Sequence, residues 1–472
     1  MKIKRKSYKK RKYVKNKTFS IYSYLYISLL IIFLILIQIY ILIKIIFRNI
    51  STNNQNKQTI QNNINKNETE TNNRNTEIIK IGYYCNSFKN GGVERVMSLL
   101  LNYLSTEKIF KHYIITKNEK EEGEYAIPND TIRICLSQSF SLFDAIKKIN
   151  LDILIYNFYK NNEIKELNKL KNTKTIFYDH SSYFYWLNLN HYNFQNSVYS
   201  SYKECKYVIS IIPIENNYLF KKWGISSILM DNFATYEYDS VTPSNLNNKN
   251  IIMIGRAYDP IKRFDLGIKA MQTIIKEIPD CIMNVITSSY EKFQSLAKEL
   301  NLGNYINFLG YISNPYMYFQ NSSLHIMPSL SESYPMVLVE AKVFGIPTIL
   351  CGLDYLALSK GGTVIIYDDT PENIGKEAIK ILKDNDYRKK LGIEARDSMK
   401  MRKNEIIKEK WIKLLVSIYK GDKYYQELVD SQEKMPQEEI DQILNNQLSI
   451  FKHKNNKFKS ITLEQFASFN FH

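Results

Sequence analysis

Short apolar runs alternate with helical patterns over most of the chain from residue 78 onward. Runs of strand type occur at 78–84, 113–116, 131–136, 153–156, 175–178, 207–211 and 228–230. Segments with the apolar spacing of a helix, such as 93–104, lie between several of these runs. Because alternation of strands and helices is typical of βαβ units, the pattern predicts a first α/β domain with a parallel sheet over 77–235.

A second series of the same kind follows a polar linker at 236–249. Strands are expected at 250–255, 282–287, 305–309, 324–328, 348–350 and 364–367, and helices at 263–278, 292–300, 315–320, 372–383 and 388–400. This series predicts a second α/β domain over 250–403. A further helix is expected within a closing segment at 404–421, and residues 422–472 read as a polar C-terminal tail with no assigned element.

The stretch 324–350 carries the strongest signal for chemistry. It reads as strand, loop, helix, turn and strand, with Pro335 expected at the first helical position and Gly345 ending the helix. Glu332 lies in the loop and Glu340 lies inside the helix. Ligands of open α/β sheets bind beyond the carboxyl ends of the strands, and both acids are expected there.

The motif S-x-x-E-S-Y-P…E-A-x-x-x-G-x-P resembles the E-x7-E signature of retaining GT-B glycosyltransferases of glycosyltransferase family 4. The resemblance implies that Glu340 accepts hydrogen bonds from the nucleotide ribose and that Glu332 faces the donor sugar. A solvated helix face is the structural alternative for Glu340. The flanking proline and glycine positions in an apolar setting disfavour it.

Two other loops carry parts of the same resemblance. Gly91 and Gly92 follow a strand and precede a helix, which is the geometry that brings a phosphate close to backbone N–H groups. Arg256 and Lys262 follow a strand of the second domain, at the spacing where the family places two cations for the donor diphosphate. A guanidinium and an ammonium can together neutralise such a group. An ordinary βα turn and ordinary surface charges are the respective alternatives.

Three further positions complete the comparison with the family. His180 directly follows a strand, where the family places a histidine in the cleft that contacts the sugar or supports its developing charge. Asn232 resembles the asparagine that ends the first domain. Ser288 and Ser289 stand where the family often has a glycine pair, which puts a backbone contact to the donor in doubt there.

The resemblance implies a GT-B fold, in which an acceptor-side domain and a nucleotide-sugar domain, both Rossmann-like, face a cleft. It implies transfer of a hexose-type sugar with retention, from a UDP- or GDP-sugar to a glycan, protein or lipid acceptor. Charge that builds on the leaving diphosphate would be stabilised by Arg256 and Lys262. No metal or other cofactor is expected, because the D-x-D letters at Asp384–Asp386 lie between helices and are expected to cap one of them.

Three other functions remain open at this point. A nucleotide-sugar epimerase would share the fold but rarely needs a membrane anchor. A hydrolase or phosphorylase would need a pair of carboxylates in distinct environments, whereas both glutamates come from one βα unit. An inactive binding module would be expected to lack Arg256, Lys262 or Glu340, all of which are present.

The N-terminal region predicts a membrane anchor rather than a nucleic-acid surface. Residues 1–17 carry ten lysines and arginines, Lys44 and Arg48 add two, and no acid precedes Glu68. Removing these twelve charges from the net +17 leaves about +5, so the excess flanks the uncharged run 18–43. The segment 18–47 is long enough to cross a bilayer, and the basic flank predicts a cytoplasmic N-terminus.

The remaining N-terminal residues and the cysteines add two expectations. Residues 48–76 are rich in Asn, Gln and Thr and are expected to form a disordered stem. The catalytic body is therefore expected in the lumen of the Golgi or endoplasmic reticulum. The five cysteines are scattered and predict neither a disulfide framework nor a zinc site.

Overall fold

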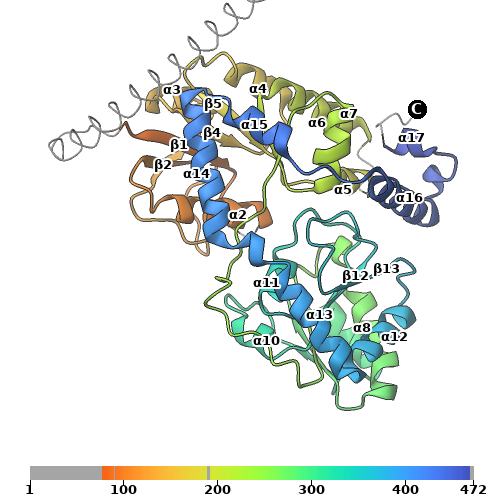
Figure 1. Ribbon diagram of the computed structural model, residues 1–472. Helices are drawn as coiled ribbons and strands as arrows, with labels where there is room; N and C mark the ends of the chain where they lie inside the picture. The colour runs from red at the N-terminus through yellow and green to blue at the C-terminus, as the bar shows by residue number, and fades with distance from the viewer. Residues whose placement is uncertain (1–76, 90, 189–191, 468–472) are drawn as a thin grey trace, which may run out of the picture. The chain divides into compact units, whose positions relative to one another are not determined.

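In the computed structural model, residues 77–89, 91–188 and 192–467 are described, and they contain two open parallel sheets (Figure 1). The predicted tail at 1–17, anchor at 18–47 and stem at 48–76 lie outside the described residues. Within the part that is described, none of the helices has the length and apolar character needed to cross a membrane.

The first sheet has the strand order β3-β2-β1-β4-β5-β6-β7, and all its neighbours pair in parallel. Its strands are β1 (Ile79–Cys85), β2 (Phe110–Thr116), β3 (Ile132–Cys135), β4 (Ile153–Tyr156), β5 (Lys174–Tyr178), β6 (Tyr207–Ser210) and β7 (Ile228–Leu229). The connecting helices are α2 (Gly92–Leu104), α3 (Leu142–Ile149), α4 (Asn161–Leu167), α5 (Tyr183–Asn188), α6 (Tyr192–Glu204) and α7 (Phe220–Lys222), with a π-helical turn at Glu215–Leu219 before α7. Each strand predicted from the apolar runs of this region is present.

The second sheet has the order β10-β9-β8-β11-β12-β13 and is also parallel throughout. Its strands are β8 (Asn250–Ile254), β9 (Ile282–Ile286), β10 (Ile306–Phe308), β11 (Leu324–Met327), β12 (Thr348–Cys351) and β13 (Thr363–Ile366). Its helices are α8 (Phe264–Glu277), α9 (Glu291–Glu299), α10 (Tyr316–Gln320), α11 (Met336–Val343), α12 (Pro371–Lys383) and α13 (Asn385–Asp397), with 3₁₀ turns at Pro260–Lys262 and Lys400–Arg402.

In both sheets the strand order reverses beside the first strand of the series. The reversal lies between β1 and β4 in the first sheet and between β8 and β11 in the second. At such a switch point the two crossovers leave in opposite directions, so a crevice opens at the carboxyl ends of the two strands. The loops after β1, β8 and β11 carry the sequence-predicted glycines, cations and first glutamate, so each set lies at a switch point.

Helix α11 begins one residue later than its sequence predicts. Pro335 is the N-cap residue, with φ −70° and ψ 110°, and its carbonyl accepts from Leu338 N at 3.0 Å. The extended ψ keeps Pro335 outside the helix although its φ would suit the first turn. Gly345 ends the segment as predicted, with a φ of +69°, and a Cβ there would lie 3.2 Å from the carbonyl oxygen of Gly392.

The closing helix α14 (Asn404–Lys420) returns to the first sheet. It packs against α2, and the buried Trp411 ring lies 5.2 Å from that of Tyr178, at the end of β5 (Figure 1). Asn404 fixes its start, because its side chain accepts from Ala234 N at 2.8 Å and donates to Ala234 O at 3.1 Å.

The segment after Gly421 is folded, whereas the sequence pattern assigned it no element. It forms α15 (Tyr424–Ser431), α16 (Gln437–Lys454), a 3₁₀ turn at Asn456–Phe458 and α17 (Leu463–Phe466). Tyr425 on α15 bonds to Val208 N of β6 at 2.8 Å, and Gln447 on α16 donates to Gly352 O at 2.6 Å. This C-terminal segment, residues 422–467, therefore contacts both sheet-bearing regions. Several of its apolar side chains are buried, including Leu448, Phe451, Phe458 and Phe466.

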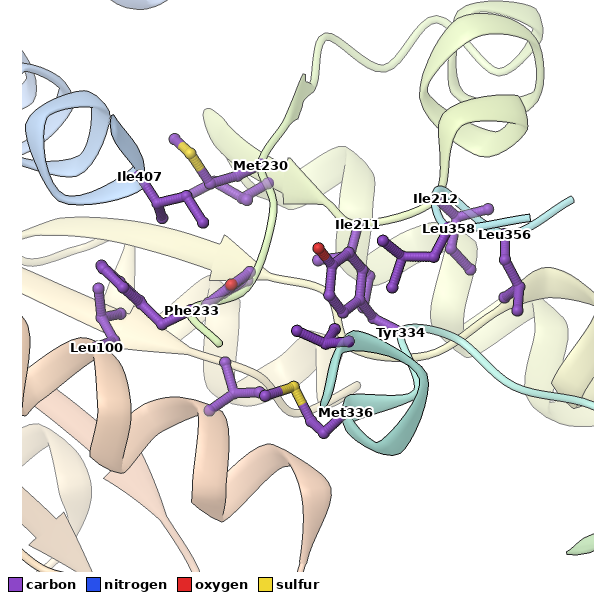
Figure 2. Close-up of a cluster of buried hydrophobic side chains, with 14 of the residues drawn as sticks. Leu100, Ile211, Ile212, Met230, Phe233, Tyr334, Met336, Leu356, Leu358 and Ile407 are labelled. Atoms are coloured by element: carbon purple, nitrogen blue, oxygen red, sulfur yellow. The ribbon is translucent and has the colours of Figure 1, made fainter. Parts of the chain in front are cut away.

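A continuous set of buried apolar side chains links residues of the two sheet regions (Figure 2). Met230 and Phe233 follow β7, Ile407 lies on α14, and Tyr334 and Met336 stand at the start of α11. Next to this cluster Tyr334 donates to Asp231 Oδ1 at 3.1 Å, and Arg402 Nε donates to the same oxygen at 3.0 Å. The base of α11 is thus anchored on the segment that leaves β7.

Candidate active site

Lys262 and Glu332 meet at the switch point of the second sheet. Lys262 ends the 3₁₀ turn after β8, and Glu332 lies in the loop after β11. The lysine Nζ lies 2.6 Å from Glu332 Oε1, and the two side chains are 19% and 10% exposed. An ion pair this well shielded is strong enough to fix both side chains when no ligand is bound. The structure therefore brings together two of the residues predicted from the sequence.

The 3₁₀ turn that carries Lys262 is capped from within its own sequence. The Asp259 carboxylate accepts from Ile261 N at 3.1 Å, and Pro260 stands at the first position, where no N–H is lost. The loop after β8 is also held by the residue that follows β9, because Thr287 Oγ1 accepts from Ala257 N at 3.0 Å. Thr287 precedes the serine pair, so its side chain supports the cation loop at this point.

Arg256 occupies the same loop but is held loosely. Its side chain is 47% exposed, and its nearest acid, Asp259, is 3.8 Å away. Its charge acts on Glu94, in the first turn of α2, and on Tyr185 of α5. Burial raises the pKa of Glu94, and the Arg256 guanidinium offsets part of that rise. The guanidinium is therefore half exposed, and two residues of the first sheet region feel its charge.

Arg263, next to Lys262, supports the same loop and was not singled out by its sequence. It has a φ of +46°, and its Nε donates to Pro328 O at 2.7 Å. Its Nη1 bonds to Asp369 Oδ2 at 2.5 Å, and Lys454 of α16 reaches the same oxygen at 2.7 Å. Burial raises the pKa of Asp369, but the bond from Lys454 and the charge of Arg263 outweigh burial and hold the pKa below its usual range.

Glu340 is buried and paired, so the solvated helix face is excluded. Its side chain is 1% exposed, and Oε1 lies 2.7 Å from Nη2 of Arg95. Burial raises the pKa of Glu340, and the Arg95 charge offsets only part of that rise. Arg95 lies three residues after Gly92, but no spacing in the sequence connects it to Glu340.

The glycine pair after β1 opens helix α2. Gly91 is the N-cap residue, with φ −110° and ψ 158°, and its carbonyl accepts from Arg95 N at 3.2 Å. A Cβ on Gly91 would lie 1.5 Å from Oε2 of Glu94, so any other residue here would require that flexible side chain to shift. Gly92 has nothing within 4 Å of its Cβ position and offers open backbone at the helix start.

His180 follows β5 on a turn that Asp179 fixes. The Asp179 carboxylate accepts from Ser181 N at 3.0 Å and from the hydroxyls of Tyr159 and Tyr202. The His180 ring lies 4.0 Å from that of Tyr178, and its Nε2 is buried without a hydrogen-bond partner among the described residues. Burial lowers the pKa of His180 to about 3, so the imidazole is neutral. It can donate or accept a hydrogen bond but carries no positive charge.

Asn232 is buried and accepts from the hydroxyl of Tyr178 at 2.5 Å, so it lies beneath the turn that carries His180.

Asp384 caps α13 as predicted, because its carboxylate accepts from Asp386 N at 3.1 Å and from Tyr387 N at 2.9 Å. Among residues 77–89, 91–188 and 192–467, no three His, Cys, Asp or Glu side chains gather as metal ligands would.

Comparison with known proteins agrees with this arrangement. Residues 236–398 match the model of the family described as Glycosyl transferases group 1, over about a third of the chain. An uncharacterized glycosyltransferase of Haemophilus influenzae is 25% identical over 298 residues, which cover 57% of this chain and 80% of that protein. A Campylobacter jejuni protein named as a GalNAc-alpha-(1->4)-GalNAc-alpha-(1->3)-diNAcBac-PP-undecaprenol alpha-1,4-N-acetyl-D-galactosaminyltransferase is 23% identical over 362 residues, which cover 72% and 99%.

Solved structures show the same two-sheet architecture. Sucrose-phosphate synthase from Thermosynechococcus elongatus has a TM-score of 0.57 at 16% identity, covering 73% of this chain and all of that one. Anabaena HepE in complex with UDP and glucose has a TM-score of 0.57 at 14% identity, covering 72% and 100%. At these identities the likeness establishes the fold, which is GT-B. The fold, the family match and the relatives together support a GT-B glycosyltransferase.

Proposed function

We propose that this protein is a retaining glycosyltransferase that moves a hexose-type sugar from a UDP- or GDP-sugar to a glycan, protein or lipid acceptor. The observation that carries the proposal is the meeting of Lys262 and Glu332 at 2.6 Å at the β8–β11 switch point. Glu340, buried and eight residues beyond Glu332, gives the same crevice a second carboxylate. Cations beside acids at a switch point suit a ligand that joins a diphosphate to hydroxyl-rich rings.

The cations would act on the leaving group. As the bond from the sugar to the diphosphate breaks, negative charge builds on the phosphate oxygens, and fixed cations stabilise it more than they stabilise the bound donor. Lys262 supplies a point charge beside Glu332, and Arg256 supplies a half-exposed guanidinium that can bind two oxygens. The open helix start at Gly91 and Gly92 offers further N–H groups on the other side of the crevice.

The two acids would hold the rest of the donor. Glu332, whose carboxylate is partly exposed, would accept from hydroxyls of the sugar, and Glu340 would accept from those of the ribose. Glu340 is now bonded to Arg95, so the ribose must share that carboxylate or displace the guanidinium. A neutral His180 would exchange hydrogen bonds with the sugar. No protein base is needed if the departing phosphate takes the acceptor proton, and no metal or other cofactor is proposed.

Residues 18–47 would tether this enzyme to a membrane, with residues 1–17 in the cytoplasm and the catalytic body in the lumen of the Golgi or endoplasmic reticulum. The support for this part of the proposal is the charge pattern of the N-terminal sequence. A disordered stem at 48–76 would separate this anchor from the folded body.

A panel of nucleotide sugars tests the proposal on the full-length protein. The expected result is release of nucleoside diphosphate with transfer of the sugar to an acceptor, and NMR of the product should show the anomeric configuration of the donor. Inversion of that configuration would overturn the retaining assignment. Release of an epimerised nucleotide sugar would instead indicate an epimerase, and binding without release would indicate an inactive module.

A further inference from the structure

Tyr355 lies beneath the loop that carries Glu332, in the connection between β12 and β13. Its side chain is 2% exposed. Its hydroxyl accepts from Glu332 N at 3.1 Å and donates to Glu332 O at 2.9 Å, and it also lies 3.3 Å from Ser331 Oγ. One hydroxyl therefore satisfies both backbone groups of Glu332.

The Tyr355 ring is held by residues far away in the sequence. It packs on Phe184 of α5 with ring centroids 4.6 Å apart, and Phe184 lies 6.0 Å from Phe466 of α17. The neighbouring Asp354 accepts from Gln447 at 2.7 Å and from Asn446 at 2.9 Å, both on α16. Because the ring packs on α5 and the preceding residue is bonded twice to α16, the hydroxyl has little freedom to move away from Glu332.

The rest of the loop gives Glu332 less support. Upstream, Leu330 N donates to Ile261 O at 2.8 Å and Arg263 bonds to Pro328 O at 2.7 Å. At Glu332 itself, Lys262 is the only hydrogen-bond or ion-pair partner of the carboxylate among the described residues. That ammonium is the group that a donor diphosphate would take up. When it does, the hydroxyl of Tyr355 remains as the fixed point for Glu332.

We infer that Tyr355 is a positioning residue that holds Glu332 toward the donor sugar through its backbone, an inference that rests on the proposed function. Tyr355 itself does no proton transfer in this scheme. Burial raises the pKa of its hydroxyl far above its usual value, so the group stays protonated and keeps donating to Glu332 O. Its effect should appear in turnover of the intact donor and not in affinity for the nucleotide, because Glu332 faces the sugar.

The test compares Tyr355→Phe with Tyr367→Phe in the full-length protein. Both changes remove one tyrosine hydroxyl, but that of Tyr367 bonds to Asp354 at 3.0 Å and does not reach Glu332. With Tyr355→Phe we expect kcat to fall about 10-fold, the scale of one to two lost hydrogen bonds, while the Kd for nucleoside diphosphate stays within about twofold. Tyr367→Phe should keep the wild-type kcat.

A double variant separates positioning from general packing. Tyr355→Phe added to Glu332→Gln should cost much less than it costs alone, because both changes act through one side chain. Full additivity, or equal losses of kcat and nucleotide affinity, would overturn the inference. If Tyr355→Phe lowers the Tm more than Tyr367→Phe does, Phe184→Leu provides a second test. That variant loosens the ring but keeps the hydroxyl, and a smaller loss confined to kcat is expected.

The two proposals fail in different ways. If the wild type and Tyr367→Phe transfer sugar and Tyr355→Phe does so at the same rate, the positioning role is wrong and the glycosyltransferase stands. If the wild type transfers no sugar from any donor of the panel, the proposed function is wrong and the positioning role falls with it.

Discussion

Arg95 and Glu340 stand 245 residues apart in the chain, and their side chains meet at 2.7 Å. Arg95 lies on the first helix after β1, and Glu340 lies on the helix after β11, so the pair joins the two switch points. The arginine is 26% exposed and the glutamate 1%. In the unliganded protein the carboxylate proposed for the ribose is therefore already occupied by a cation that solvent can reach.

Replacing Arg95 by Gln should destabilise the protein more at pH 8 than at pH 5. Burial already raises the pKa of Glu340 above that of an exposed glutamate, and removing the Arg95 charge raises it further. A carboxyl group with a raised pKa in the folded state stabilises at low pH, and that contribution is lost as the pH rises through the raised pKa. We expect a loss of about 3 kcal/mol at pH 8, partly recovered at pH 5, by urea unfolding.

The control for this prediction is Lys380→Gln, which breaks an exposed pair with Glu377 on α12. It should change the free energy of unfolding by less than about 0.5 kcal/mol at either pH. A loss with Arg95→Gln that is the same at pH 5 and pH 8 would mean that the buried carboxylate is stabilised by some other group.

Arg256→Ala and Lys262→Ala should each reduce sugar transfer by about 10- to 150-fold. Each removes charge-assisted hydrogen bonds worth about 1.5–3 kcal/mol from the leaving diphosphate. The double variant should lose less than the product of the two, because both cations act on one group. Initial rates of nucleoside diphosphate release measure this, with Lys269→Ala, an exposed lysine of the neighbouring helix α8, as the control. Near-normal rates in either variant would move the donor site elsewhere.

The predicted strands of both sheets are present because their signal is local. A buried parallel strand is a short apolar run, and runs such as 153–156 need no knowledge of their neighbours. The residues at the carboxyl ends, Lys262 and Glu332 among them, then come together because parallel strands all end on one edge. Pro335 was placed one residue too far into its helix, since proline fixes φ at a helix start but not ψ.

Contacts between distant segments of the chain could not be predicted, because they leave no local pattern in the sequence. Arg95, Arg263 and Tyr355 reach the site through side chains whose partners lie elsewhere in the chain. The C-terminal segment 422–467 was missed for another reason. Its helices pair a narrow apolar stripe with many polar residues, and α16 buries only Ile440, Ile443, Leu444, Gln447, Leu448 and Phe451. Such a stripe becomes recognisable only beside the surface that it covers.

Phe466→Ala should cost about 3–5 kcal/mol of stability, although this residue lies in what the sequence reads as a polar tail. Its side chain is fully buried against Phe451 and Phe458, with ring centroids 5.4 and 6.1 Å away. Removing it leaves a cavity as well as losing the transfer free energy of the ring. Met401→Ala, at a position 72% exposed, should change stability by less than about 0.5 kcal/mol. Similar urea midpoints for the two variants would mean that α17 is not packed in solution.

The body of the protein should be protected from protease in sealed microsomes. Ten basic residues before residue 18 favour a cytoplasmic N-terminus and a translocated body. Addition of protease should spare residues 77–472 until detergent opens the vesicles, as followed with an antibody to the C-terminal segment. Digestion without detergent would place the body in the cytosol, where the acceptor would be presented on the cytosolic membrane face.

Glu340→Gln and Glu332→Gln should separate the nucleotide from the sugar. If the Glu340 carboxylate accepts from the ribose, its loss should weaken nucleoside diphosphate and intact donor by about 10- to 150-fold, or roughly 1.5–3 kcal/mol. Glu332→Gln should leave nucleoside diphosphate affinity unchanged and impair the intact donor, since its proposed partner is the sugar.

Calorimetry with nucleoside diphosphate on both variants makes the comparison, with thermal unfolding alongside because Glu340 is buried and bonded to Arg95. The affinity of Arg95→Gln for nucleoside diphosphate provides a third measurement. If the ribose displaces the guanidinium, that variant should bind nucleoside diphosphate at least as tightly as the wild type, because no cation competes for the carboxylate. If the ribose shares the carboxylate with Arg95, it should bind more weakly. Unaltered affinity in all three variants would place the nucleotide away from Glu340, and the helix after β11 would then serve only to join the two sheet regions.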